Sequence, residues 1–134
     1  MKFDQIVQSI LLEKTIFSPK EDIEIIGIGK FGAKIDSGND AFGVLHGDDI
    51  KIEDNVVHFT TSDNKRVKKP LIDTIKINVG AGVEEDRPIV HFDIILKGNK
   101  YKNQKFSIGN RSDNEEKVLI GLKFLEPLKA LIQC

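Results

Sequence analysis

The sequence is poor in cysteine, because Cys134, at the last position, is the only one in 134 residues. One cysteine cannot form a disulfide within the chain, and it cannot supply the several thiolates of a structural zinc site. This composition favours a reducing compartment, and we expect a cytoplasmic protein.

Net charge and long apolar runs are also nearly absent. The chain has 20 Lys and Arg against 21 Asp and Glu, a formal charge of −1. Such a balance gives no overall field that would attract nucleic acid or an anionic membrane. No apolar run approaches the roughly 20 residues that cross a bilayer, and the first residues do not have the pattern of a secretion signal. We therefore expect neither nucleic acid nor a membrane among its partners.

The hydrophobic content of 40% is enough for one domain with its own core. At the N-terminus the apolar residues follow helical spacing, which predicts an amphipathic helix that caps the domain or contacts a partner. We expect residues 1–20 to form a helical extension and residues 21–134 to form the domain. The apolar stripe consists of Phe3, Ile6, Val7, Ile10 and Leu11.

From Ile23 onward the pattern changes to short β-type segments. In Ile89–Lys97 apolar residues alternate with polar ones, which is typical of a half-buried strand. Val118–Gly121 is a short buried apolar run. The other expected strands are Ile23–Ile28, Ala33–Asp36, Val56–Thr61, Ile72–Val79 and Lys105–Ile108.

Turn-forming residues separate these strands. Lys97–Lys100 predicts a hairpin, and Ser62–Lys65 and Gly80–Gly82 predict two more turns. Leu122–Ile132 has helical spacing, but Pro127 limits where a helix can start. We expect a mostly β fold, a small barrel or sandwich with a helix at each end.

Two features that often accompany cofactor or metal binding have simpler explanations here. Gly27–Gly32 fits the dinucleotide-binding pattern G-x-G-x-x-G, but the residues after it cannot sustain the required helix. Tight turns between strands explain these glycines better. His46, His58 and His91 lack the spacing of a metal site, so we expect them to be solvated or structurally hydrogen-bonded.

The order of several short motifs is more specific. Ala33–Gly38 reads A-K-I-D-S-G, followed by Leu45-His46, Arg87–Val90, Asn110–Ser112 and Leu119–Gly121. Asp-Ser-Gly after a strand, with a distant apolar-apolar-Gly run, resembles the retropepsins, the single-lobe aspartic proteases. The whole series more closely resembles the bacterial and phage retropepsin-like family historically called putative ATP-dependent zinc proteases, over about residues 23–125.

This resemblance implies a small closed β-barrel that hydrolyses peptide bonds as a homodimer. Each subunit supplies one Asp36, and two close carboxylates share a proton so that one acts as acid and the other as base. Ser37 would hydrogen-bond across the dimer axis, and Gly38 would let the backbone approach the carboxylates. The resemblance also implies a mobile flap, for which Gly80, Ala81 and Gly82 are the first choice and Ser62–Lys65 the second.

In the family the apolar-Gly run, here Leu119, Ile120 and Gly121, supports the catalytic loop. No cofactor is implied. The family's zinc label finds no ligand set in this sequence, so we expect no metal.

The sequence also departs from the family pattern. Asn39 stands in place of the usual Ala, Phe42-Gly43 in place of a small polar pair, and Leu122 in place of Arg. These changes leave two hypotheses. The first is an active aspartic endopeptidase acting on a peptide or protein. The second is a catalytically silent module that serves in a larger protein assembly, such as the virion of a phage.

Overall fold

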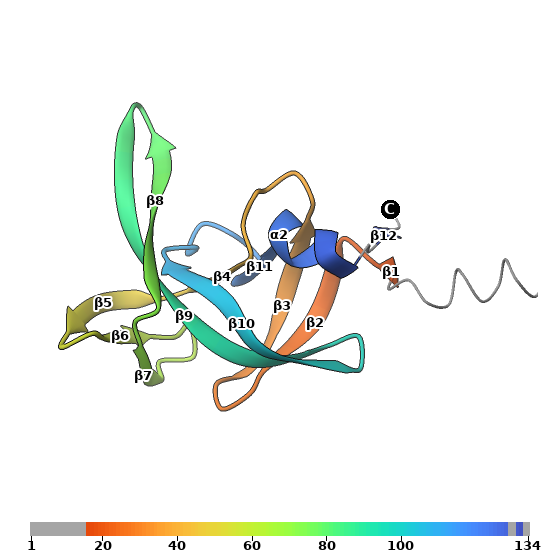
Figure 1. The fold of residues 1–134 in the computed structure, drawn as a ribbon, viewed down its shortest axis with the longest axis horizontal. Coiled ribbons are helices and arrows are strands. Elements are labelled where there is room, and N and C mark those ends of the chain that lie inside the picture. The colour runs from red at the N-terminus through yellow and green to blue at the C-terminus, as the bar shows by residue number, and fades with distance from the viewer. Residues whose placement is uncertain (1–15, 129–130, 133–134) are drawn as a thin grey trace, which may run out of the picture.

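The computed structural model describes residues 16–128 and 131–132 and is mostly β (Figure 1). The helix expected over Phe3–Leu11 lies outside the described residues. The strands are β1 Ile16–Phe17, β2 Lys20–Ile25, β3 Gly29–Asp36, β4 Gly43–His46, β5 Asp48–Glu53, β6 Val56–Thr60, β7 Arg66–Pro70, β8 Asp73–Gly80, β9 Val83–Leu96, β10 Asn99–Gly109, β11 Val118–Gly121 and β12 Leu131–Ile132.

Seven strands form the main sheet, in the order β10-β4-β11-β3-β2-β9-β8, and β10 also pairs with β9. β5, β6 and β7 form a second, antiparallel sheet. The β8–β9 hairpin projects from the body of the molecule, and its tip stands apart from the loop that follows β3 (Figure 1).

The core lies where these sheets meet. Along β9 every second residue from Pro88 to Leu96 is buried, which is the alternation expected of a half-buried strand. Phe92 packs edge-to-face on Phe59 of the small sheet and on Phe106 of β10, with ring centroids 6.5 and 5.8 Å apart. Phe17 of β1 is fully buried in the same core.

Most of the expected strands and turns are confirmed. Lys97 and Gly98 have positive φ and form the turn between β9 and β10. Asn64 also has positive φ and lies in the turn between β6 and β7. Gly27, with φ of 85°, lies in the turn between β2 and β3, and Gly29, with φ of 152°, is the first residue of β3, so the G-x-G-x-x-G match is a turn and the start of a strand. β9 begins at Val83 rather than Ile89, because its first half pairs with β8 outside the core.

Two expectations about the chain's elements were incomplete or wrong. The strands β4, whose residues are all buried, and β5 were not predicted, and the expected C-terminal helix is much shorter than Leu122–Ile132. The α-helix α2 covers Leu122–Leu125, and a 3-10 turn over Glu126–Leu128 contains Pro127. Leu131 and Ile132 pair with β1 as a parallel strand instead of continuing the helix. Pro127 has no N–H to donate, which limits the helix to its first turns.

Candidate functional site

The Asp36 loop begins where β3 ends and is anchored by the apolar-Gly run. β11 runs parallel to β3, so that Ile120 pairs with Ile35 and Gly121 with Asp36. Ile35 and Ile120 are buried, which fixes this end of β3 in the core. The structure therefore brings Asp36 together with Leu119, Ile120 and Gly121, although these residues lie far from it along the chain.

Hydrogen bonds give the loop its shape. The Gly38 N–H donates to Asp36 Oδ1 at 3.0 Å, and the Asn39 N–H donates to the Asp36 carbonyl at 3.2 Å. A Cβ at position 38 would lie 3.2 Å from the same carboxylate oxygen, so glycine permits this close approach. The Leu122 N–H donates to the Asn39 carbonyl at 2.8 Å and ties the loop to α2.

The Asp36 carboxylate is partly open to solvent. Its side chain is 30% exposed, and Oδ2 lies 3.7 Å from Lys34 Nζ. Ser37 is exposed as well. The loop thus presents one carboxylate and one hydroxyl on the surface, and both can be reached by a second molecule.

A cavity of about 400 Å³ lies beside this loop, between residues 39–44 and the base of the β8–β9 hairpin. Ile75 and Ile77 of β8 supply apolar lining, and Phe42 adds an aromatic ring. Arg87, Lys105, Arg111 and Lys123 also line it, against Asp40 and Asp73. A cavity of this size, with an apolar wall and a few charged groups, can accommodate a peptide segment.

The three residues expected to form a flap lie away from the Asp36 loop, at the tip of the β8–β9 hairpin. Gly80, Ala81 and Gly82 have φ of 107°, 52° and 75° and make the turn. Val79 and Val83 flank it and are each at least half exposed. The second choice, Ser62–Lys65, turns β6 into β7, and Lys65 Nζ donates to the Ile28 carbonyl at 2.8 Å. That contact joins it to the β2–β3 turn.

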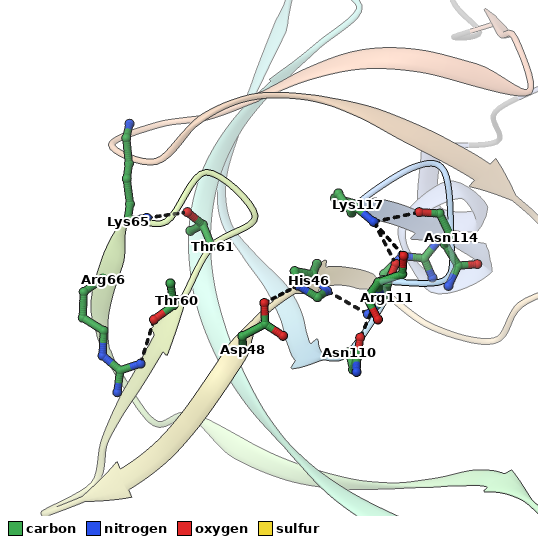
Figure 2. Close-up of polar contacts among 11 residues, drawn as sticks. His46, Asp48, Thr60, Thr61, Lys65, Arg66, Asn110, Arg111, Asn114 and Lys117 are labelled. Atoms are coloured by element: carbon green, nitrogen blue, oxygen red, sulfur yellow. Dashed lines mark hydrogen bonds and ion pairs between the residues drawn. The ribbon is translucent and has the colours of Figure 1, made fainter.

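A buried hydrogen-bond network next to the cavity was not predicted from the sequence. The Arg111 N–H donates to His46 Nδ1 at 2.8 Å, so the ring proton sits on Nε2 and faces Asp48 Oδ2 at 2.8 Å. Figure 2 shows His46 between these two partners. His46 is therefore a structurally hydrogen-bonded histidine, as expected. The Asn110–Ser112 motif marked the place of Arg111, but nothing in the motif indicated that the side chain would be buried.

The Lys117 side chain holds the loop between β10 and β11, which contains Arg111. Its Nζ donates to the carbonyls of Arg111, Ser112 and Asn114 at 3.2, 3.2 and 2.9 Å (Figure 2). Next to it in the chain, the Glu116 carboxylate lies 2.9 Å from Lys20 Nζ. The hydrogen bond with Lys20 lowers the pKa of the Glu116 carboxyl, and the same contact raises the pKa of Lys20.

Over residues 16–128 and 131–132 the structure contains no cluster of three or more histidine, cysteine or acidic residues that could hold a metal ion. In the same part of the chain, no helix is both long and apolar enough to cross a membrane.

Comparisons with known proteins bear on the fold. No family model and no curated protein matches this sequence. The crystal structure of Lpg0085, a protein of unknown function (DUF785) from Legionella pneumophila, is similar to this chain with a TM-score of 0.71. The two share 20% sequence identity, and the match covers 89% of this chain and 92% of Lpg0085. At that identity the likeness establishes a shared fold and carries no function.

Proposed function

We propose that this protein is an aspartic endopeptidase of the retropepsin-like type, with an active site assembled from two copies of the chain. The observation that carries the proposal is the Asp36 carboxylate. It is held by the Gly38 N–H at the end of β3 and anchored by the parallel pairing with Gly121. The sequence has one Asp-Ser-Gly loop, so a second subunit must supply the second acid across a two-fold axis.

The proposed fold is the closed barrel of the retropepsins. In its support, β10 and β9 stand at opposite ends of six consecutive strands of the main sheet and also pair with each other, from Ser107 with Ile89 to Asn99 with Leu96. Such a pairing joins the ends of an open sheet into a ring.

In the proposed reaction a water lies between the two Asp36 carboxyls. The ionised carboxylate takes a proton from this water as its oxygen attacks the peptide carbonyl carbon, and the protonated carboxyl gives its proton to the carbonyl oxygen. The C–N bond then breaks as the carboxyl that took the water's proton gives it to the leaving nitrogen, while a hydroxyl of the tetrahedral intermediate returns its proton to the other carboxylate. Ser37 hydroxyls would hold the two loops in register, since Ser37 lies exposed beside Asp36.

The β8–β9 hairpin is the proposed flap. Its tip is flanked by the exposed apolar side chains of Val79 and Val83, and its base lines the cavity through Ile75 and Ile77. Closure over a bound peptide would bury these side chains and exclude water.

The test is cleavage of an unfolded protein by the purified full-length chain, with the oligomeric state measured in the same buffer. We expect a dimer whose cleavage is inhibited by pepstatin and abolished in Asp36→Asn. Asp54→Asn, which changes an exposed carboxylate in the turn between β5 and β6, away from the cavity, is the control and should retain cleavage. Cleavage that survives Asp36→Asn, or cleavage by a strictly monomeric chain, would refute the proposal.

The second candidate is a silent module of the same fold that serves in a protein assembly such as a phage virion. Leu122 favours it. This residue follows Gly121 directly, where the family pattern has an arginine, and its backbone N–H is what it contributes to the loop. For this candidate the wild-type chain cleaves nothing, and Asp36→Asn assembles as the wild type does.

A further inference from the structure

Arg111 is a buried arginine fixed at the wall of the cavity. The residue is 8% exposed, and its Nε donates to the Glu116 carbonyl at 3.2 Å. The backbone N–H is fixed by His46, and the Lys117 ammonium holds the Arg111 carbonyl. Both the backbone and the inner end of the side chain are therefore held in place before any ligand arrives.

The outer end of the Arg111 guanidinium carries the two nitrogens Nη1 and Nη2. Within the part of the chain that the structure describes, no hydrogen bond or ion pair engages Nη1 or Nη2 of Arg111. In the same part, no polar side-chain atom is both sealed from solvent and unpaired. The Nη groups therefore keep some access to solvent, and Arg111 is one of the residues that line the cavity.

The other charges near Arg111 act on its guanidinium in opposite directions. The Arg87 side chain packs against Gly109, where a Cβ would collide with it. The Nε of Arg87 already donates a hydrogen bond to Glu85 Oε2 at 3.0 Å. Burial lowers the pKa of Arg111, and the charge of Arg87 lowers it further, against the opposite influence of Glu116 and Asp36. The Glu116 carboxylate is itself paired with Lys20.

A planar guanidinium with two free Nη groups matches the two oxygens of a carboxylate. The cavity that Arg111 lines is also bordered by residues 39–44, which follow Asp36, and by Ile75 and Ile77 of the β8–β9 hairpin. A bound carboxylate would neutralise the buried charge and offset the repulsion from Arg87.

We propose that Arg111 is a specificity-determining residue that binds a carboxylate of the substrate next to the bond to be cut. This inference rests on the proposed peptidase function. The carboxylate can come from an acidic side chain or from the C-terminus of the substrate, and the experiment separates these two sources.

The test measures peptide binding to the full-length Asp36→Asn chain. This variant cannot cleave, and the oxygen of its new amide side chain can still accept the Gly38 N–H. Four fluorescent peptides share one apolar sequence. They carry Glu or Gln at the central position and end in a free carboxyl or an amide. We expect the dissociation constant of a peptide with the recognised carboxylate to be at least about tenfold lower than that of the same peptide with a neutral group in its place.

Arg111→Gln in the same background should remove that preference. Arg66→Gln, which changes an arginine on β7 away from the cavity, should leave it unchanged. Arg111→Lys keeps the charge but cannot bind a carboxylate in the bidentate geometry of arginine, so it should reduce the preference several-fold. This variant tests the inference if Arg111→Gln does not fold.

A preference for Glu over Gln assigns the site to a side chain, and a preference for the free carboxyl over the amide assigns it to a terminus. Equal binding of all four peptides, or no binding of any, overturns the inference. The proposed function fails separately: if wild-type protein binds with a carboxylate preference but cuts no peptide, the subsite stands without the peptidase. If it cuts all four peptides equally well, the peptidase stands without the subsite.

Discussion

The backbone of Ala41 lies directly against Gly121, so that no side chain fits at position 121. A Cβ there would overlap the Ala41 carbonyl oxygen and come within 2.8 Å of its carbon. The two segments are also joined by hydrogen bonds, from the Gly121 N–H to the Phe42 carbonyl and from the Lys123 N–H to the Ala41 carbonyl. The loop after Asp36 thus closes over the end of β11.

Gly121→Ala should therefore destabilise the protein by about 2–3 kcal/mol, because the new methyl group meets backbone rather than a mobile side chain. Urea denaturation measures this. Gly32→Ala is the matched control. A Cβ at Gly32, in β3, would have no atom within 4 Å. The free energy of unfolding of this variant should therefore stay within about 1 kcal/mol of the wild type. Equal losses in the two variants would contradict the close packing at Gly121.

The proposed active site of two copies makes a prediction about mixtures of wild-type and variant chains. If each site needs one Asp36 from each subunit, mixing wild type with Asp36→Asn should reduce activity as the square of the wild-type fraction. A complete site within each chain would give a linear decrease instead. The measurement is the cleavage rate at constant total protein after the subunits have exchanged.

Two glycines with nearly the same φ can separate the role of the proposed flap from the stability of the fold. Gly82 and Gly98 have φ of 75° and 76°, and a Cβ would meet no atom within 4 Å at either position. An alanine at either should cost roughly 1 kcal/mol of backbone strain. We expect only Gly82→Ala to lower kcat/KM, because only Gly82 lies at the tip of the proposed flap. A similar fall in kcat/KM in Gly98→Ala would show that the backbone strain acts on the whole fold rather than on the flap.

Glu116 should contribute to acid sensitivity. Its pKa is lowered in the folded protein from the ordinary value of 4.5, so the folded state binds this proton less readily than the unfolded state. Its contribution to stability is therefore present above that ordinary pKa and lost as the pH falls through the lowered one. Glu116→Gln should have a lower urea midpoint than wild type at about pH 7, and the difference should vanish at acid pH.

Glu115→Gln is the control for this titration. Glu115 also lies near Lys20, at 3.1 Å, but its side chain is 82% exposed and the contact is screened by solvent. The change should shift the midpoint less than Glu116→Gln does. A Glu116→Gln effect that is the same at neutral and at acid pH would contradict the assigned role.

Lys117 should hold the loop that carries Arg111. Lys117→Met leaves three carbonyls without their common donor. We therefore expect a loss of about 1–3 kcal/mol and faster amide hydrogen exchange over residues 112–116. Lys65→Met removes a single hydrogen bond, to the Ile28 carbonyl, and should cost less without affecting that loop. Unchanged exchange in Lys117→Met would show that the loop is held by other contacts.

Local patterns in the sequence were sufficient for the strands that alternate and for the turns. Ile89–Lys97 reads as a strand because every second side chain enters the core, and Lys97-Gly98 reads as a turn because glycine tolerates positive φ. β4 was not predicted because it shows no alternation and, unlike the equally buried Val118–Gly121, is no continuous apolar run, since it begins with Gly43 and ends with His46. The strand β12 depends on its pairing with β1, a partner at the other end of the described chain.

In the candidate site, too, some features follow from local sequence and others from tertiary structure. The Asp36-Ser37-Gly38 loop and the apolar-Gly run could be recognised from consecutive residues, because each is a short segment that carries its chemistry within itself. The contact of Gly121 with Ala41, and the burial of Arg111 at the cavity, could not be recognised in that way. Both depend on which distant strands pair, and this pairing is set by the packing of the whole core rather than by any one segment.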